Sequence, residues 1–65
     1  MMLKVNGKDT EFGGGTVGDL LTALKVRDKN MVVEKNRCIV HREAYDAEPV
    51  ADGDMIELVR FVGGG

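Results

Sequence analysis

The sequence has few of the residues that cross-link a small protein or let it stack on other molecules. It contains one cysteine, one proline and no tryptophan, and its other aromatic residues are one tyrosine and two phenylalanines. A single cysteine, Cys38, excludes an internal disulfide, and so few rings leave no platform for nucleic-acid bases. The net charge of −2 argues against binding by phosphate neutralisation, so we expect no nucleic-acid partner.

Long apolar runs are also missing. No stretch approaches the roughly 20 residues that span a bilayer, and the first residues lack the basic and then apolar pattern of a secretory signal. We therefore expect a cytoplasmic protein with no membrane partner. A chain of 65 residues forms one domain and buries only about 60% of its unfolded surface. That size leaves no room for a deep catalytic pocket, so we expect a protein that is not an enzyme.

The first 25 residues show a hairpin followed by a helix. Leu3 and Val5 alternate with polar residues in "MMLKVNGKDTEF", and Asn6-Gly7 is a strong signal for a tight hairpin turn. In "TVGDLLTALK", apolar residues recur at helical spacing, Thr16 is a natural N-cap, and Asp19 lies where a capping box needs an acceptor. Gly18 within this helix is expected to cost about 1 kcal/mol relative to alanine.

The rest of the chain completes a sheet. "NMVVEKNRCIV" predicts a strand, a turn and a short strand. The polar segment that follows is either a loop or a short 3₁₀ turn, and it leads to the last strand, "MIELVRFV". The first and last strands are the most apolar, so we place them side by side at the centre. The fold class predicted is α+β, a β-grasp: a mixed sheet of four to five strands packed on one helix. In the last strand Ile56 and Leu58 face the helix, whereas Val59 and Phe61 point outward.

Two other motifs suggest a dinucleotide site or a metal site, but neither has the residues that such a site needs. The segment from Gly13 to Gly18 matches G-x-G-x-x-G, but it lacks the buried parallel strand and the doubly wound sheet that a dinucleotide site needs. We interpret it as a turn that leads into the helix. Cys38 is interpreted as a small apolar filler and His41 as a loop residue, and together they supply too few ligands for a metal.

The acidic residues of the second half allow two interpretations. No lysine or arginine interrupts the run Glu43, Asp46, Glu48, Asp52, Asp54 and Glu57. Such a run is either a solvated surface or an electrostatic footprint for a basic partner.

The end of the chain, "FVGGG", raises the functional question. We divide the chain into a domain at 1–62 and a flexible glycine tail at 63–65. The tail is either a disordered chain end or the reactive part of the molecule. Three extended residues reach roughly 10 Å, and without side chains they fit a narrow channel. The terminal carboxylate is inert until a phosphoryl group activates it, so this chemistry would need an ATP-using partner.

The element order, "DGDMIELV" at the last strand and the terminal Gly-Gly resemble the ThiS/MoaD family of ubiquitin-like sulfur carriers over the whole chain. The ending "VRFVGGG" is most similar to the thiamine branch. This resemblance implies that a ubiquitin-activating-type adenylyltransferase (ThiF-like) adenylates Gly65. The carboxylate then becomes a thiocarboxylate, which donates sulfur for thiazole formation inside thiazole synthase (ThiG-like). ATP and Mg²⁺ would belong to the activating partner, and this chain would bind no cofactor or metal.

The resemblance also implies site residues. Gly64 and Gly65 form the reacting pair, and the residues that would contact partners are Val59, Phe61, Val62 and Gly63. The chain is expected to be a monomer when free. Other readings remain open: the small subunit of molybdopterin synthase, a ubiquitin-like modifier of proteins, or a non-covalent β-grasp interaction module.

Overall fold

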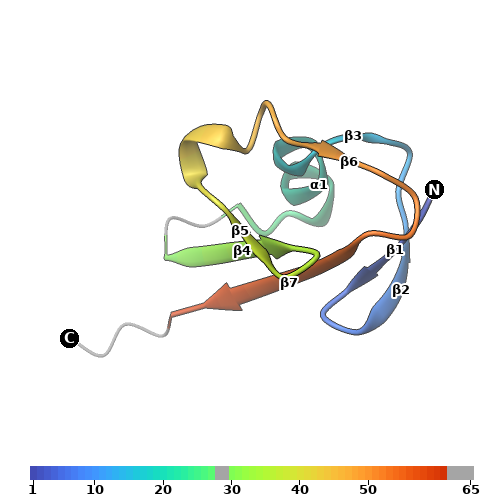
Figure 1. Ribbon diagram of the computed structural model, residues 1–65, viewed down its shortest axis with the longest axis horizontal. Helices are drawn as coiled ribbons and strands as arrows, with labels where there is room; N and C mark the ends of the chain where they lie inside the picture. Colours follow the sequence, from blue (N-terminus) through green and yellow to red (C-terminus); the bar gives the residue numbers. More distant parts are fainter. Residues whose placement is uncertain (28–29, 62–65) are drawn as a thin grey trace.

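The computed structural model describes residues 1–27 and 30–61, and it shows a mixed sheet with one helix packed across one face (Figure 1). The elements in chain order are β1 (Met2–Val5), β2 (Lys8–Glu11), β3 (Gly15–Thr16), α1 (Val17–Leu24), β4 (Met31–Lys35), β5 (Cys38–Val40), the 3₁₀ helix η1 (Arg42–Ala44), β6 (Pro49–Val50) and β7 (Met55–Arg60). The predicted β-grasp is confirmed. In the described ranges, no helix has the length and hydropathy to cross a membrane.

The main sheet has the strand order β2-β1-β7-β4-β5. β1 and β7 run parallel at its centre, and the other neighbours are antiparallel. The prediction that the first and last strands lie side by side is therefore confirmed. A second sheet of two short strands, β3 and β6, was not predicted, because its pairing joins the glycine turn to the polar loop around Pro49.

The hairpin turn between β1 and β2 has the geometry that Asn6-Gly7 predicts. Both residues have positive φ, 51° and 79°, as a type I′ turn requires. Asn6 also extends the sheet with its side chain, because its Oδ1 accepts a hydrogen bond from the backbone N–H of Leu58 at 2.7 Å. Its own N–H donates to the carbonyl of Ile56 at 2.8 Å. The turn thus holds β7 in place at the point where β1 ends.

The helix α1 begins with a complete capping box. The N–H of Asp19 donates to Oγ1 of Thr16 at 3.2 Å, and the N–H of Thr16 donates to Oδ2 of Asp19 at 3.0 Å. Gly15 precedes this box with φ of 131°, and a Cβ at this position would collide with the Asp19 carboxylate. The capping box at the start of α1 therefore requires glycine at position 15. This role explains the glycine turn without a dinucleotide site.

The core lies between α1 and the sheet. The helix contributes the predicted stripe, with Val17, Leu20 and Leu21 fully buried and Leu24 partly buried. Opposite them, the fully buried side chains of the sheet are Leu3, Val33 and Ile56. A helix of eight residues is marginal in isolation, so this packing supplies most of its stability.

Gly18 has a packing role that its helix propensity does not reveal. It is buried, and its N–H donates to the carbonyl of Tyr45 at 2.8 Å. A Cβ at this position would meet the carboxylate of Asp46. The loop after η1 therefore approaches the helix at Gly18. This close contact offsets part of the free energy of unfolding that glycine costs within a helix.

Candidate functional site

The last described residues of β7 form the centre of the candidate site. Strand alternation is as predicted: Ile56 is fully buried and Leu58 is partly buried on the helix side. Val59 and Phe61 point to the opposite side and are 44% and 58% exposed. The N–H of Phe61 donates to the carbonyl of Asn30 at 2.8 Å. The sheet therefore supports the chain up to Phe61, with both apolar side chains presented outward.

The register of the sheet adds residues that the sequence did not place there. We call the surface of the main sheet away from α1 the outer face. Val32 lies directly opposite Val59, and Ile39 of β5, which is 59% exposed, lies opposite Glu34. By alternation, the exposed apolar side chains on the outer face are Met2, Ile39, Met55, Val59 and Phe61. Several exposed apolar side chains on one face of so small a domain indicate a contact surface.

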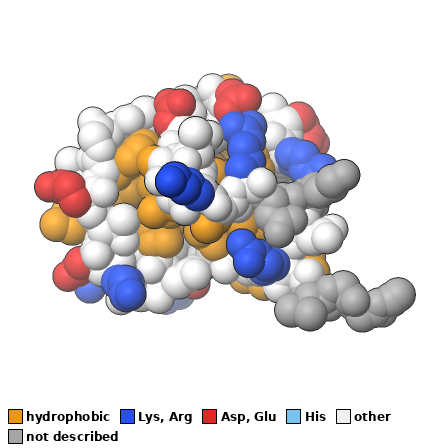
Figure 2. All heavy atoms as spheres, turned by 180° about the vertical axis from the view of Figure 1, so that it is seen from behind, with side chains coloured by type: hydrophobic (Ala, Val, Ile, Leu, Met, Phe, Trp, Pro, Cys, Tyr) orange, Lys and Arg blue, Asp and Glu red, His pale blue; other side chains and the backbone are white. Residues whose placement is uncertain are grey.

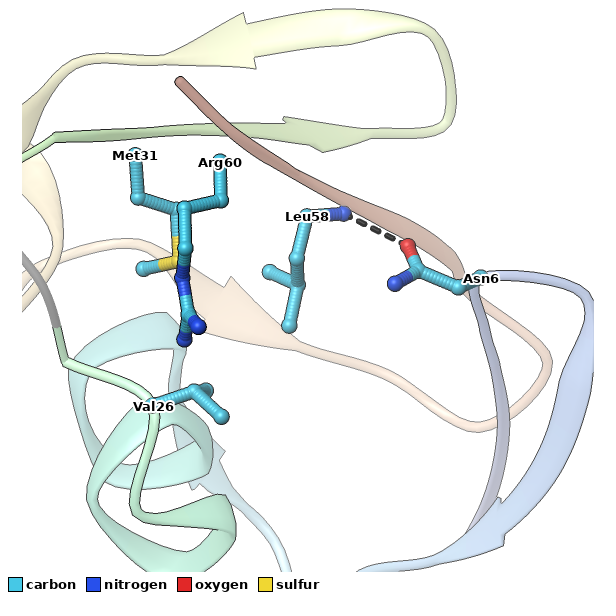
Figure 3. A pocket seen from close by; sticks show the side chains of 5 residues that line it. All are labelled: Asn6, Val26, Met31, Leu58 and Arg60. Carbon is cyan, nitrogen blue, oxygen red and sulfur yellow. Dashed lines mark hydrogen bonds between the residues drawn. The ribbon is translucent and has the colours of Figure 1, made fainter. Parts of the chain in front are cut away.

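A hollow of about 220 Å³ lies on the other side of β7. Its walls are Asn6, Val26, Met31, Leu58 and Arg60. Figure 3 shows Leu58 directed into this space and Arg60 reaching from β7 toward Val26 beside Met31. In Figure 2, hydrophobic side chains gather in the middle of the visible side of the molecule, with lysine and arginine side chains around them. The strand before the chain end thus has apolar surface on both sides.

The start of β7 is held by hydrogen bonds from the β4–β5 turn. Oδ1 of Asn36 accepts from the N–H of Met55 at 2.9 Å, and Nδ2 of Asn36 donates to Asp54 at 3.0 Å. Burial alone would raise the pKa of Asp54. The hydrogen bonds from Ala51 and Asn36 and the charge of Lys35 outweigh it and hold the pKa below the ordinary value of 3.8. Asp54 is therefore an ionised anchor for the strand.

Most acidic residues of the run from Glu43 to Glu57 form ion pairs or hydrogen bonds with other parts of the domain. Asp46 pairs with Arg27 at 3.3 Å, Glu48 pairs with Lys35 at 2.6 Å, and Asp52 accepts from the N–H of Met2 at 2.6 Å. With Asp54, these residues fasten the loop between β5 and β7 to the rest of the domain. The interpretation as a footprint for a basic partner therefore does not apply to the run as a whole.

Two smaller expectations have different outcomes. The interpretation of Cys38 as an apolar filler is wrong, because the residue is exposed. The reason is that β5 is an edge strand that pairs only with β4. His41 is exposed and precedes η1, so its assignment to a loop is confirmed. Nothing in the described residues brings these two side chains together as a catalytic pair.

Comparison with known proteins identifies the family. The model of the ThiS family matches residues 3–65. The chain belongs to the ThiS family. Over 66 aligned residues it is 42% identical to the sulfur carrier protein ThiS of Bacillus subtilis (strain 168), covering 98% of this chain and 100% of that protein. The crystal structure of a thiamine biosynthesis protein (ThiS) from Geobacter metallireducens is 43% identical, with a TM-score of 0.86 and both chains covered completely.

A longer protein also contains a region similar to this ThiS-family chain. A thiazole synthase of Paramagnetospirillum magneticum (strain ATCC 700264 / AMB-1) is 41% identical in an alignment of 66 positions, which covers 100% of this chain and 20% of that protein. The remaining site predictions, Val62, Gly63, Gly64 and Gly65, lie outside the described residues. They stay predictions that rest on sequence.

Proposed function

We propose that this ThiS-family chain is a sulfur carrier of thiamine biosynthesis that reacts through the carboxylate of Gly65. The observation that carries the proposal is the match of the ThiS family to residues 3–65, which includes the terminal glycines. The full-length similarity to a sulfur carrier protein supports it. In this role the chain is a substrate of its partner enzymes and not a catalyst.

The first step is activation of the carboxylate by a ThiF-like adenylyltransferase. A terminal oxygen of Gly65 attacks the α-phosphorus of ATP, which forms an acyl adenylate and releases pyrophosphate. ATP and Mg²⁺ are held by the partner, where the metal stabilises the charge of the phosphates. The contribution of this chain is to present an end without side chains that a narrow site can surround.

The second step replaces AMP by sulfur. A hydrosulfide equivalent supplied by a donor attacks the acyl carbon, AMP leaves, and the product is a thiocarboxylate at Gly65, with no change in the oxidation state of sulfur. This thiocarboxylate then gives its sulfur to the thiazole precursor in a ThiG-like thiazole synthase, and the acyl carbon takes up an oxygen atom from the precursor or from water in exchange, which regenerates the carboxylate. The occurrence of a similar region within a thiazole synthase supports this choice of partner.

The body of the domain supplies recognition. The outer face carries exposed Val59 and Phe61 immediately before the chain end, so an enzyme that surrounds Gly65 must approach this surface. Apolar anchors near the centre of an interface carry much of its binding energy. We therefore assign the outer face to partner binding and the residues after Phe61 to reaction.

The test uses the complete chain with its activating enzyme, ATP and a sulfur donor. We expect intact-mass analysis to show replacement of one terminal oxygen by sulfur. Deletion of Gly65, or addition of an alanine after it, should abolish the product while the urea midpoint stays unchanged. If the extended chain still supports thiazole formation, the role is that of a non-covalent module and the proposal is wrong.

A second experiment tests the recognition surface. Phe61→Ala should raise the KM for the carrier in ATP–pyrophosphate exchange by about tenfold or more, as expected for an apolar anchor, with kcat unchanged. The matched control is Thr22→Ala, because Thr22 is exposed on α1 and not on the sheet. If the Phe61 variant and the control have the same KM, the outer face does not bind the activating enzyme.

A further inference from the structure

The hollow beside β7 runs from an exposed rim to a buried floor. Met31 forms the floor and is 7% exposed, and Val26 and Leu58 are half-buried walls. Asn6 and Arg60 are exposed and form the rim. The volume of about 220 Å³ exceeds that of a cavity of roughly 150 Å³ that takes benzene in another protein. The hollow is therefore open to solvent and large enough for a branched aliphatic side chain.

The polar side chains that border the hollow offer hydrogen-bond donors. Oδ1 of Asn6 already accepts from the N–H of Leu58 at 2.7 Å, and Figure 3 shows the amide nitrogen of Asn6 turned toward the Leu58 side chain. Among the residues that the structure describes, no acceptor pairs with this Nδ2. Arg60 adds a guanidinium, which has five N–H donors and can serve more than one acceptor. An occupant must therefore bring an apolar group together with an acceptor.

An aliphatic residue of another protein has both of these groups. Its side chain fills the space between Val26, Met31 and Leu58, while its own main-chain carbonyl accepts from the donors at the rim. A lysine or arginine side chain fits less well, because its charged end brings only donors toward Asn6 and Arg60. Binding pockets commonly have this composition, an apolar lining with a few polar groups that fix the orientation of the ligand.

The position of the hollow indicates which protein supplies that residue. Leu58 and Arg60 line it from one side of β7, and Val59 and Phe61 lie on the other side, on the outer face. An enzyme that surrounds the chain after Phe61 therefore approaches both sides of the same strand. The hollow is thus continuous with the surface that we assign to partner binding.

We propose that the hollow beside β7 receives an aliphatic side chain of the adenylyltransferase that activates Gly65, and that Asn6 and Arg60 donate to the main-chain carbonyl of the same residue. This inference rests on the proposed function, because that function defines the partner. A single apolar anchor in a pocket can carry a large share of the binding energy of an interface. The enzyme then holds β7 from the helix side as well as from the outer face.

The first variant fills the hollow. Val26→Phe places a ring in the space that the aliphatic side chain would occupy. Thr22→Phe is the matched control, because Thr22 is exposed on α1 and does not line the hollow. In ATP–pyrophosphate exchange by the adenylyltransferase, we expect Val26→Phe to raise the KM for the carrier by about tenfold with unchanged kcat, as for the loss of an apolar anchor. Thr22→Phe should leave KM unchanged.

The second variant removes a donor at the rim and keeps the hydrogen bond within the fold. Asn6→Asp retains an acceptor for the N–H of Leu58, but it replaces Nδ2 by an oxygen that repels a carbonyl. Thr22→Asp is the control that adds the same charge away from the hollow. We expect Asn6→Asp to raise KM by roughly fivefold, as for the loss of one hydrogen bond, and Thr22→Asp to leave it unchanged.

The outcomes distinguish this inference from the proposed function. If the unmodified chain supports exchange and either variant has the KM of its control, the hollow does not receive a residue of the enzyme. A KM that rises only in variants with a lower urea midpoint than their controls also contradicts the inference. If the unmodified chain self-associates in sedimentation velocity and Val26→Phe abolishes this, the occupant is a second copy and the inference is wrong. If the unmodified chain supports no exchange at all, the proposed function falls and this inference with it.

Discussion

Gly15 offers a sharp test of how the sequence begins its helix. The substitution Gly15→Ala places a Cβ against the Asp19 carboxylate at a residue with φ of 131°. The matched control is Gly13→Ala, because an added Cβ at Gly13 meets nothing within 4 Å and its φ is ordinary. Both variants replace one glycine by alanine in the same turn, so they differ mainly in the backbone conformation and the neighbouring capping box.

The two changes should have opposite effects on the free energy of unfolding. A backbone conformation that only glycine adopts easily costs about 1–3 kcal/mol for alanine, and loss of the cap costs about 1 kcal/mol. We therefore expect Gly15→Ala to lower the stability by roughly 2–4 kcal/mol. Gly13→Ala should be neutral or stabilise the domain by up to about 1 kcal/mol, because alanine reduces the freedom of the unfolded chain.

Urea unfolding followed by far-UV circular dichroism measures both variants, since the chain has no tryptophan for fluorescence. For a domain of this size, each kcal/mol corresponds to a change of about 4–8 °C in Tm. A Gly15→Ala variant within about 0.5 kcal/mol of Gly13→Ala would refute the explanation of the glycine turn. Where Gly15→Ala stays folded, it should still be adenylated with unchanged KM, because the turn is remote from the end of β7 (Figure 1).

Two further predictions concern the anchors of β7. Asn6→Ala should lower the free energy of unfolding by about 1–2 kcal/mol, because it removes the acceptor for the N–H of Leu58 and places alanine at a positive φ. Asn6→Asp keeps the acceptor and should lower it less. Equal urea midpoints for the two variants would contradict this explanation. The pKa of Asp54 is lower in the folded than in the unfolded chain, so its contribution is complete above the ordinary value of 3.8 and is lost as the pH falls through the folded value. Asp54→Asn should therefore lower the free energy of unfolding at pH 7, by less than about 1 kcal/mol because the Asp54 side chain is only partly buried. The difference should shrink below pH 3.8; a difference that is constant with pH would show that ionisation has no part.

Local features of the site could be predicted because they depend on residues close together in the chain. The turn at Asn6, the capping box at Thr16 and the outward direction of Val59 and Phe61 each follow from a spacing of a few residues. The reaction proposed at Gly65 stays a prediction that rests on sequence, since residues 62–65 lie outside the described part of the chain.

Features that join distant segments could not be predicted in the same way. The pairing of β4 with β5 and β7 decides that Ile39 shares the outer face with Val59, and that Glu34 lies opposite Glu57. The hydrogen bond from the N–H of Gly18 to the carbonyl of Tyr45 likewise joins the helix to a residue 27 positions later in the chain.

The sequence by itself determined the helix and the strands of the main sheet, together with their inner and outer sides, because strand alternation, helical spacing and turn geometry act between near neighbours. Tertiary structure alone decided which exposed residues became neighbours on the outer face, which acids were used inside the fold, and that Cys38 lay at an exposed edge. The physical reason is the register of the strands. A shift of one residue between two paired strands changes every contact across them, and the packing of the whole core selects one register.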